Sequence, residues 1–84
     1  MVDTPNPEPP RELTFGEKAV GLTFNPSGDP LITHIKTMYA QVIDHLNNTR
    51  MLTSNTEIKR MLSVAITEAQ TSQMWAVKAV TWQH

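Results

Sequence analysis

Apolar residues recur every three or four positions along two segments of the chain, which is the pattern of amphipathic helices. The first segment extends from residue 30 to about residue 48, and its apolar positions are Ile32, Ile35, Tyr39, Val42 and Leu46. The second extends from about residue 54 to residue 82 and contains neither Gly nor Pro. The pattern predicts an all-α fold.

Capping signals mark where the two long helices begin. Asp29 is a favourable N-cap, and Pro30 stands where the first helical residue belongs. Ser54 and Glu57 form a capping-box pattern at the start of the second helix. A connection over about residues 49–53, where polar residues weaken the first helix, is short enough to make the two helices antiparallel neighbours. We therefore predict a two-helix hairpin.

A shorter helix is predicted before the hairpin. Thr14 and Glu17 form another capping-box pattern, and Gly21 can end that turn. At 1.5 Å per residue the second long helix is about 40 Å long and the first is under about 30 Å, so the second should overhang the first. We expect residues 13–24 to fold back beside residues 74–82 and cover the overhang.

A stripe of small residues runs along the second long helix. Its members are Ala65, Ala69, Ser72, Ala76 and Ala79. Small side chains let helix axes approach closely, so the stripe fits packing on the first helix or on a second subunit. Further apolar residues lie on other faces, and a hairpin alone cannot bury them all. We predict a homo-oligomer.

Composition separates the first residues from the rest. Four of the six prolines fall within residues 1–10, which is typical of a disordered segment. We predict a disordered Pro-rich leader over residues 1–12 and a single helical hairpin domain over residues 13–84. A domain of about 70 residues has a marginal core, for which oligomerisation is a common remedy.

Charge and residue usage exclude several function classes. The chain has no Cys, so disulfides and Cys-based zinc sites are excluded. A net charge of −1 argues against binding of a DNA or RNA polymer, whereas a small cluster of cations would still bind a small anion. Nothing resembles a signal peptide or a membrane-spanning run. We expect a cytoplasmic protein.

The residues that most often carry catalysis are scattered. His34 and His45 share a helix face but lie about 16 Å apart, too far for one metal ion. Glu68 is the only acid in the body of the second long helix. Phosphate-binding loops and nucleophile motifs are absent from the sequence. We predict no catalytic residue, metal or cofactor, and interpret the chain as a binding protein.

Two groups of aromatic and basic residues suit ligand binding. Phe24 lies in a turn-rich loop before a helix N-terminus, a natural place for a phosphorylated ligand. Lys36 lies near this loop and, unlike the apolar-stripe residue Tyr39, has no packing role to explain it. On the second long helix Trp75, Lys78 and Trp82 form one stripe. It suits base stacking with phosphate pairing, or anchoring of a subunit interface.

These segments also carry a resemblance to a known family. It rests on GEKAVGLTFNPSGDP, on IKTMYAQVIDHL and on MLSVAITEAQTSQMWAVKAVTW, and it covers about residues 13–82. The chain resembles the small phage-encoded anti-CBASS proteins, which share a helical hairpin domain with a group of anti-Thoeris sponges. The resemblance implies a homohexamer that binds cyclic oligonucleotide messengers between protomers and sequesters them without cleavage.

The resemblance also implies where ligands bind. Family pockets for cyclic dinucleotides use an aromatic residue and a lysine, and the best matches here are Phe24 and Lys36, with their neighbours Asn25 and Tyr39. A second pocket, for cyclic trinucleotides on a symmetry axis, uses a basic residue of the long helix. The candidates for it are Arg60 and Lys78.

The function expected from the resemblance is that of a phage anti-defence sponge in the cytoplasm of the infected bacterial host. It would keep CBASS effectors from being activated. The alternative is a non-catalytic helical adaptor or assembly protein, which the small-residue stripe and the Trp pair would serve equally well. A cyclic-nucleotide phosphodiesterase is disfavoured because the sequence offers no metal-ligand cluster.

Overall fold

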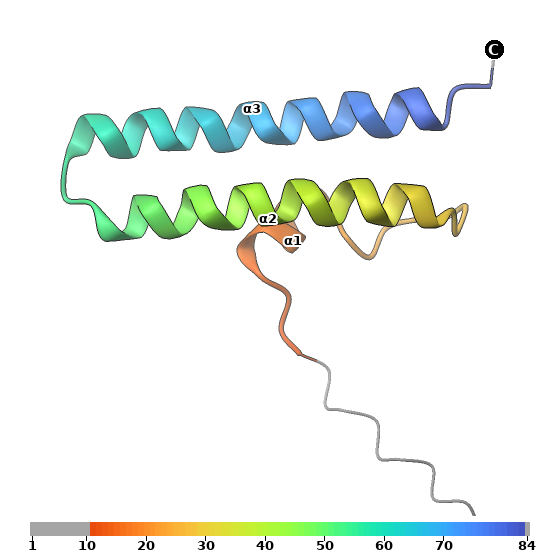
Figure 1. Cartoon of the computed structure of the whole chain (residues 1–84), viewed down its shortest axis with the longest axis horizontal. Coiled ribbons are helices and arrows are strands. Elements are labelled where there is room, and N and C mark those ends of the chain that lie inside the picture. Colours follow the sequence, from red (N-terminus) through yellow and green to blue (C-terminus); the bar gives the residue numbers. More distant parts are fainter. Residues whose placement is uncertain (1–10, 84) are drawn as a thin grey trace, which may run out of the picture.

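The computed structural model describes residues 11–83 and shows a hairpin of two long helices (Figure 1). Over these residues it contains three helices and no strand: α1 (Phe15–Val20), α2 (Pro30–Leu52) and α3 (Thr56–Val80). α2 and α3 lie side by side and antiparallel, and α1 packs mainly against α2. The predicted all-α hairpin with a short N-terminal helix is confirmed. Most of the predicted leader lies outside the described residues.

The helix starts of α1 and α2 agree with the capping signals. In α1 the Thr14 side chain accepts from the backbone N–H of Glu17, and the Glu17 carboxylate accepts from the N–H of Thr14. Gly21 ends α1 with a left-handed φ of 64°, a conformation that favours glycine. At α2 the Asp29 carboxylate accepts from the N–H of Leu31 at 2.9 Å, and a proline follows as expected.

The connection between the long helices is shorter than predicted. α2 does not end near residue 48 but continues to Leu52. Its polar residues bond within the helix instead of breaking it: the Thr49 hydroxyl donates to the His45 carbonyl, and the Asn47 side chain accepts from Arg50. The predicted Ser54 cap is also wrong. Asn55 caps α3 by accepting from the N–H of Ile58 at 3.0 Å.

The predicted overhang is wrong as well. Because α2 has 23 residues and α3 has 25, little of α3 extends beyond its partner. α1 therefore rests against the middle of α2, and only its end and the following loop line cavities together with residues of the segment 74–82. There the N–H of Gly16 donates to the Asp44 carboxylate at 2.7 Å. Gln70 of α3 donates from the other long helix to the Ala19 carbonyl at 3.3 Å.

A small apolar core lies where the three helices meet. It consists of Val20 from α1, Ala40 and Ile43 from α2, and Ile66 from α3. Gly16 lets α1 approach this closely, because a Cβ atom there would lie only 2.1 Å from the carbonyl oxygen of Ala40. The close packing of the core thus depends on the absence of a side chain at Gly16.

The middle of the small-residue stripe of α3 faces α2, as one of its two readings predicted. Ala69 packs against the core, and the Ser72 hydroxyl lies 2.6 Å from that of Tyr39. Many large apolar side chains nevertheless remain exposed, among them Met38, Val42, Met61, Val64 and Trp75. The homo-oligomer stays a prediction that this exposure supports. None of the described helices is both long and apolar enough to cross a membrane.

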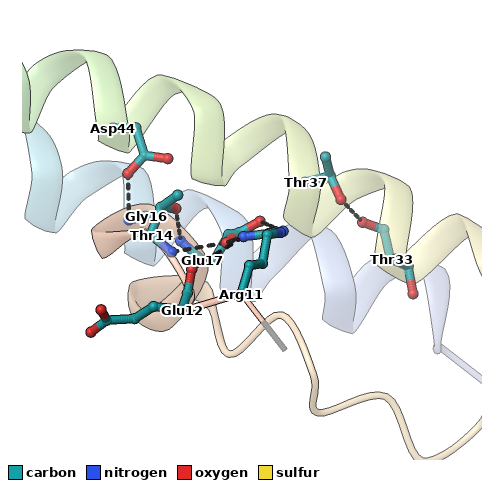
Figure 2. Close-up of polar contacts among 8 residues, drawn as sticks. All are labelled: Arg11, Glu12, Thr14, Gly16, Glu17, Thr33, Thr37 and Asp44. Carbon is teal, nitrogen blue, oxygen red and sulfur yellow. Dashed lines mark hydrogen bonds and ion pairs between the residues drawn. The ribbon is translucent and has the colours of Figure 1, made fainter. Parts of the chain in front are cut away.

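Arg11 forms a bidentate ion pair with Glu17 at the start of α1 (Figure 2). Its guanidinium donates to both carboxylate oxygens of Glu17 at 2.6 Å. The hydrogen bond from Arg11, together with that from the Thr14 backbone, lowers the pKa of Glu17 to about 2. The cap of α1 is therefore built around a carboxylate that stays ionised far into the acid range.

We expect the stabilising contribution of Glu17 to disappear in acid. Its folded pKa of about 2 lies below its ordinary value of 4.5, so the contribution is present above pH 4.5 and is lost as the pH falls towards 2. Thermal melts of the wild type and of Glu17→Gln should differ most at neutral pH and converge at low pH. Melting temperatures that differ equally at pH 6 and at pH 2.5 would contradict this assignment.

Candidate functional site

The loop between α1 and α2 is organised by the side chain of Asn25. Its amide nitrogen donates to the Asp29 carbonyl at 2.9 Å and to the Thr33 hydroxyl at 3.0 Å. Its amide oxygen accepts from the Ser27 hydroxyl at 3.1 Å. Asn25 therefore holds the loop against the first turn of α2, and its polar atoms are engaged within the loop.

Lys36 lies beneath this loop and holds it from inside. Its side chain comes from α2, is only 5% exposed, and donates through Nζ to the carbonyls of Gly21 and Phe24. The ammonium also lies 5.6 Å from the centre of the Phe24 ring. The interpretation that Lys36 has no role within the fold is therefore wrong, because it joins α2 to two points of the loop.

Phe24 is the most exposed ring at this end of the molecule. It is 71% exposed although its backbone is held by Lys36. A cavity of about 350 Å³ opens beside it. The lining residues are Phe24, Asn25, Pro26, Ser27, Ile32, Lys36, Val77, Thr81 and Gln83. An aromatic face, a cation and several polar groups thus meet in one hollow between the loop and the end of α3.

A second and larger cavity adjoins the first. It has a volume of about 620 Å³ and lies between the end of α1 and α3. Lys36 and Val77 line both cavities, and the larger one adds the cation Lys18 and the amides Gln70 and Gln73. Lys36 therefore lies between two hollows that both open to solvent.

Sequence reasoning missed the contribution of α3 to these cavities. Gln73 is only 5% exposed and follows the core residue Ile66 by two helical turns on the same face. A polar residue at an inward position of an amphipathic helix was the available signal. No signal in the sequence pointed to Thr81 and Gln83, because they lie at or beyond the end of α3.

The other predicted site residues lie elsewhere. The Tyr39 hydroxyl bonds to Ser72 in the contact between α2 and α3. Arg60 lies near the hairpin turn, where it pairs with Glu57 at 2.6 Å and lowers the pKa of that carboxyl. Lys78 sits 5.0 Å from the centre of the Trp75 ring. The structure brings Phe24, Asn25 and Lys36 together, but not Tyr39, Arg60 or Lys78.

Comparison with protein families matches residues 17–81 to the family described as Acb2/Tad1, hairpin domain. The match includes most of α1, the whole loop and both long helices. The chain belongs to the Acb2/Tad1 hairpin family. The resemblance drawn from the sequence is thereby confirmed. No curated protein and no solved structure matched the chain.

Membership gives the site its functional setting. The Acb2/Tad1 hairpin family is that of the anti-CBASS and anti-Thoeris sponges, a non-catalytic class that binds cyclic oligonucleotides. The protein is thus a phage anti-defence sponge. Phe24, Asn25 and Lys36 all fall within the matched range. Among residues 11–83, no three His, Asp or Glu side chains are grouped as a metal site would require.

Proposed function

We propose that this Acb2/Tad1 hairpin protein sequesters cyclic dinucleotides in the cytoplasm of the infected host, without cleaving them, and so keeps CBASS effectors inactive. The observation that carries the proposal is the state of Lys36. The residue is only 5% exposed, yet no carboxylate of residues 11–83 forms an ion pair with its ammonium. A buried cation without a counter-ion is a natural partner for a ligand anion.

The donors of Lys36 allow such a contact. A lysine ammonium has three N–H groups, and two carbonyls of the loop take two of them. The third remains for a ligand oxygen. A phosphate would supply both the acceptor and the missing negative charge, and hydrogen bonds between charged groups are the stronger kind. Binding of a phosphate would therefore complete the environment of Lys36 without displacing the loop.

Phe24 provides the second half of the recognition. Its exposed ring offers a stacking surface beside the same cavity, and stacking contributes about 1–3 kcal/mol per base. A charge-assisted hydrogen bond adds about 1.5–3 kcal/mol before entropic costs. A cyclic dinucleotide carries two bases and two phosphates, so two such sites would give sub-micromolar affinity.

A second protomer completes the proposed pocket. The cavity of about 350 Å³ is near the lower limit for a small-molecule site and opens to solvent. Several large apolar side chains on both long helices are exposed in the single chain. Both features support a homohexamer in which protomers share ligands. For a cyclic trinucleotide, Arg60 and Lys78 remain the proposed contacts.

The proposal is tested by calorimetric titration with a panel of cyclic di- and trinucleotides. We expect at least one cyclic dinucleotide to bind, and the matching linear dinucleotide to bind more weakly. After binding, the protein is denatured and the released nucleotide is analysed. Full recovery of the intact ring supports a sponge, whereas a linear product would show an enzyme. Absence of binding across the panel would favour the helical adaptor.

A further inference from the structure

Gln73 is a buried polar side chain without a partner in the described part of the fold. The residue is only 5% exposed, and it lines the cavity of about 620 Å³ between the end of α1 and α3. Its side chain forms no hydrogen bond with residues 11–83. Those residues also contain no fully enclosed polar side-chain atom that lacks a hydrogen bond, so the amide of Gln73 opens into the cavity. A buried amide left unpaired is costly, and a ligand in the cavity would pair it.

The wall of this cavity that α3 forms offers mainly hydrogen-bond acceptors. The hydroxyls of Thr67 and Thr71 donate to backbone carbonyls one turn earlier in the helix, which leaves their oxygens as acceptors. The amide nitrogen of Gln70 donates to the Ala19 carbonyl at 3.3 Å, and its oxygen accepts from none of the residues 11–83. This wall therefore suits a ligand group that donates hydrogen bonds, such as an amino group.

Lys36 connects this cavity to the smaller one beside Phe24, because its side chain lines both. A phosphodiester has a nucleoside on each side. A phosphate held at Lys36 can therefore place one base against Phe24 and the next base in the larger cavity. The volume of about 620 Å³ lies within the range of small-molecule sites, and Met74 and Val77 provide apolar surface for the faces of a base.

We propose that Gln73 is a specificity-determining residue that recognises adenine in the sequestered cyclic dinucleotide. Its amide oxygen accepts from the exocyclic amino group, and its amide nitrogen donates to the neighbouring ring nitrogen, the two-bond pairing that Gln makes with adenine. Uracil has no amino group. On the Watson–Crick edge of guanine the amino group lies beside a protonated nitrogen, so this pair does not form there either. This role rests on the proposed function, because the ligand must first be held at Lys36.

Calorimetric titration of the unchanged protein tests whether the amino group is recognised. The probes are cyclic di-AMP and an analogue in which hydrogen replaces both 6-amino groups. We expect cyclic di-AMP to bind about tenfold or more tightly than the analogue, because the analogue leaves the amide oxygen of Gln73 unpaired. Equal affinities for the two ligands overturn the role of Gln73 and leave the sponge function intact.

Gln73→Met removes the amide at similar side-chain length and links the preference to this residue. It should weaken cyclic di-AMP by about tenfold or more and the analogue by less, so that the two ligands bind nearly alike. Gln41→Met is the matched control and should keep the preference, because Gln41 is exposed on α2 and lines neither cavity. Circular dichroism checks the fold. A preference that survives in folded Gln73→Met overturns the role.

Cyclic di-UMP distinguishes failure of this role from failure of the proposed function. It carries the same two phosphates, but its bases have no amino group. Binding of cyclic di-UMP as tight as that of cyclic di-AMP overturns adenine recognition and leaves the sponge function intact. If none of the three ligands binds, the proposed function fails and the role of Gln73 fails with it. The comparison between ligands uses the unchanged chain, so it decides the outcome even if Gln73→Met does not fold.

Discussion

Gly16→Ala should lower the free energy of unfolding by about 3 kcal/mol, the upper end of the usual range for overpacking. The added Cβ would lie 2.1 Å from the Ala40 carbonyl oxygen and 2.9 Å from the Asp44 carboxylate. The first contact is with helix backbone, so it cannot be relieved by rotating a side chain. α1 would have to move away from α2, and the hydrogen bond between Gly16 and Asp44 would lengthen.

Chemical denaturation measures the loss, with Lys18→Ala as the matched control. Lys18 lies on the same helix, is exposed, and makes only a long ion pair of 3.4 Å with Glu12. The control should therefore change stability by less than about 1 kcal/mol. Asp44→Ala removes the acceptor of the hydrogen bond from Gly16 and should fall between the two. Equal stability of Gly16→Ala and Lys18→Ala would show that α1 does not pack closely on α2 in solution.

Features of the fold that depend on neighbouring residues could be predicted from the sequence. The caps formed by Thr14, Glu17 and Asp29 are local, because each side chain bonds to backbone two or three residues away. The end of α2 could not be predicted in this way. Asn47 and Thr49 are poor helix formers on average, but here their side chains bond within the helix. Because α2 is a few residues longer than predicted, α3 has little overhang. The position of α1 had been inferred from that overhang and therefore could not be predicted either.

The candidate site was predictable to a similar extent. The nearness of Phe24 to Lys36 followed from the short loop that carries Phe24 and leads into the helix of Lys36. The burial of Lys36 did not follow, because it depends on where the loop carbonyls point after folding. Tyr39 lies on the same helix as Lys36 but turns to Ser72, a partner 33 positions away. Such pairings depend on how α2 and α3 are aligned, which periodicity alone does not determine.

The largest effect on ligand binding is expected from Lys36→Ala. If Lys36 holds a phosphate, its loss removes one charge-assisted hydrogen bond, about 1.5–3 kcal/mol or about 10- to 150-fold in affinity. The structure also predicts a cost to the fold. The carbonyls of Gly21 and Phe24 lose their common donor, which should lower the free energy of unfolding by about 1–3 kcal/mol. Calorimetry and denaturation measure the two effects separately.

Phe24→Ala is the variant that separates binding from folding. Its ring is 71% exposed, so we expect little change in stability but a loss of about 1–3 kcal/mol in binding from the missing stacking surface. The salt dependence of affinity gives a further distinction. Added salt should weaken the wild type and Phe24→Ala alike, and weaken Lys36→Ala less, because that variant has one cation fewer to screen. An unchanged salt dependence in Lys36→Ala would mean that Lys36 only supports the loop. The phosphate would then have to be held by another cation, and Lys18, which lines the adjoining cavity, is the candidate to test.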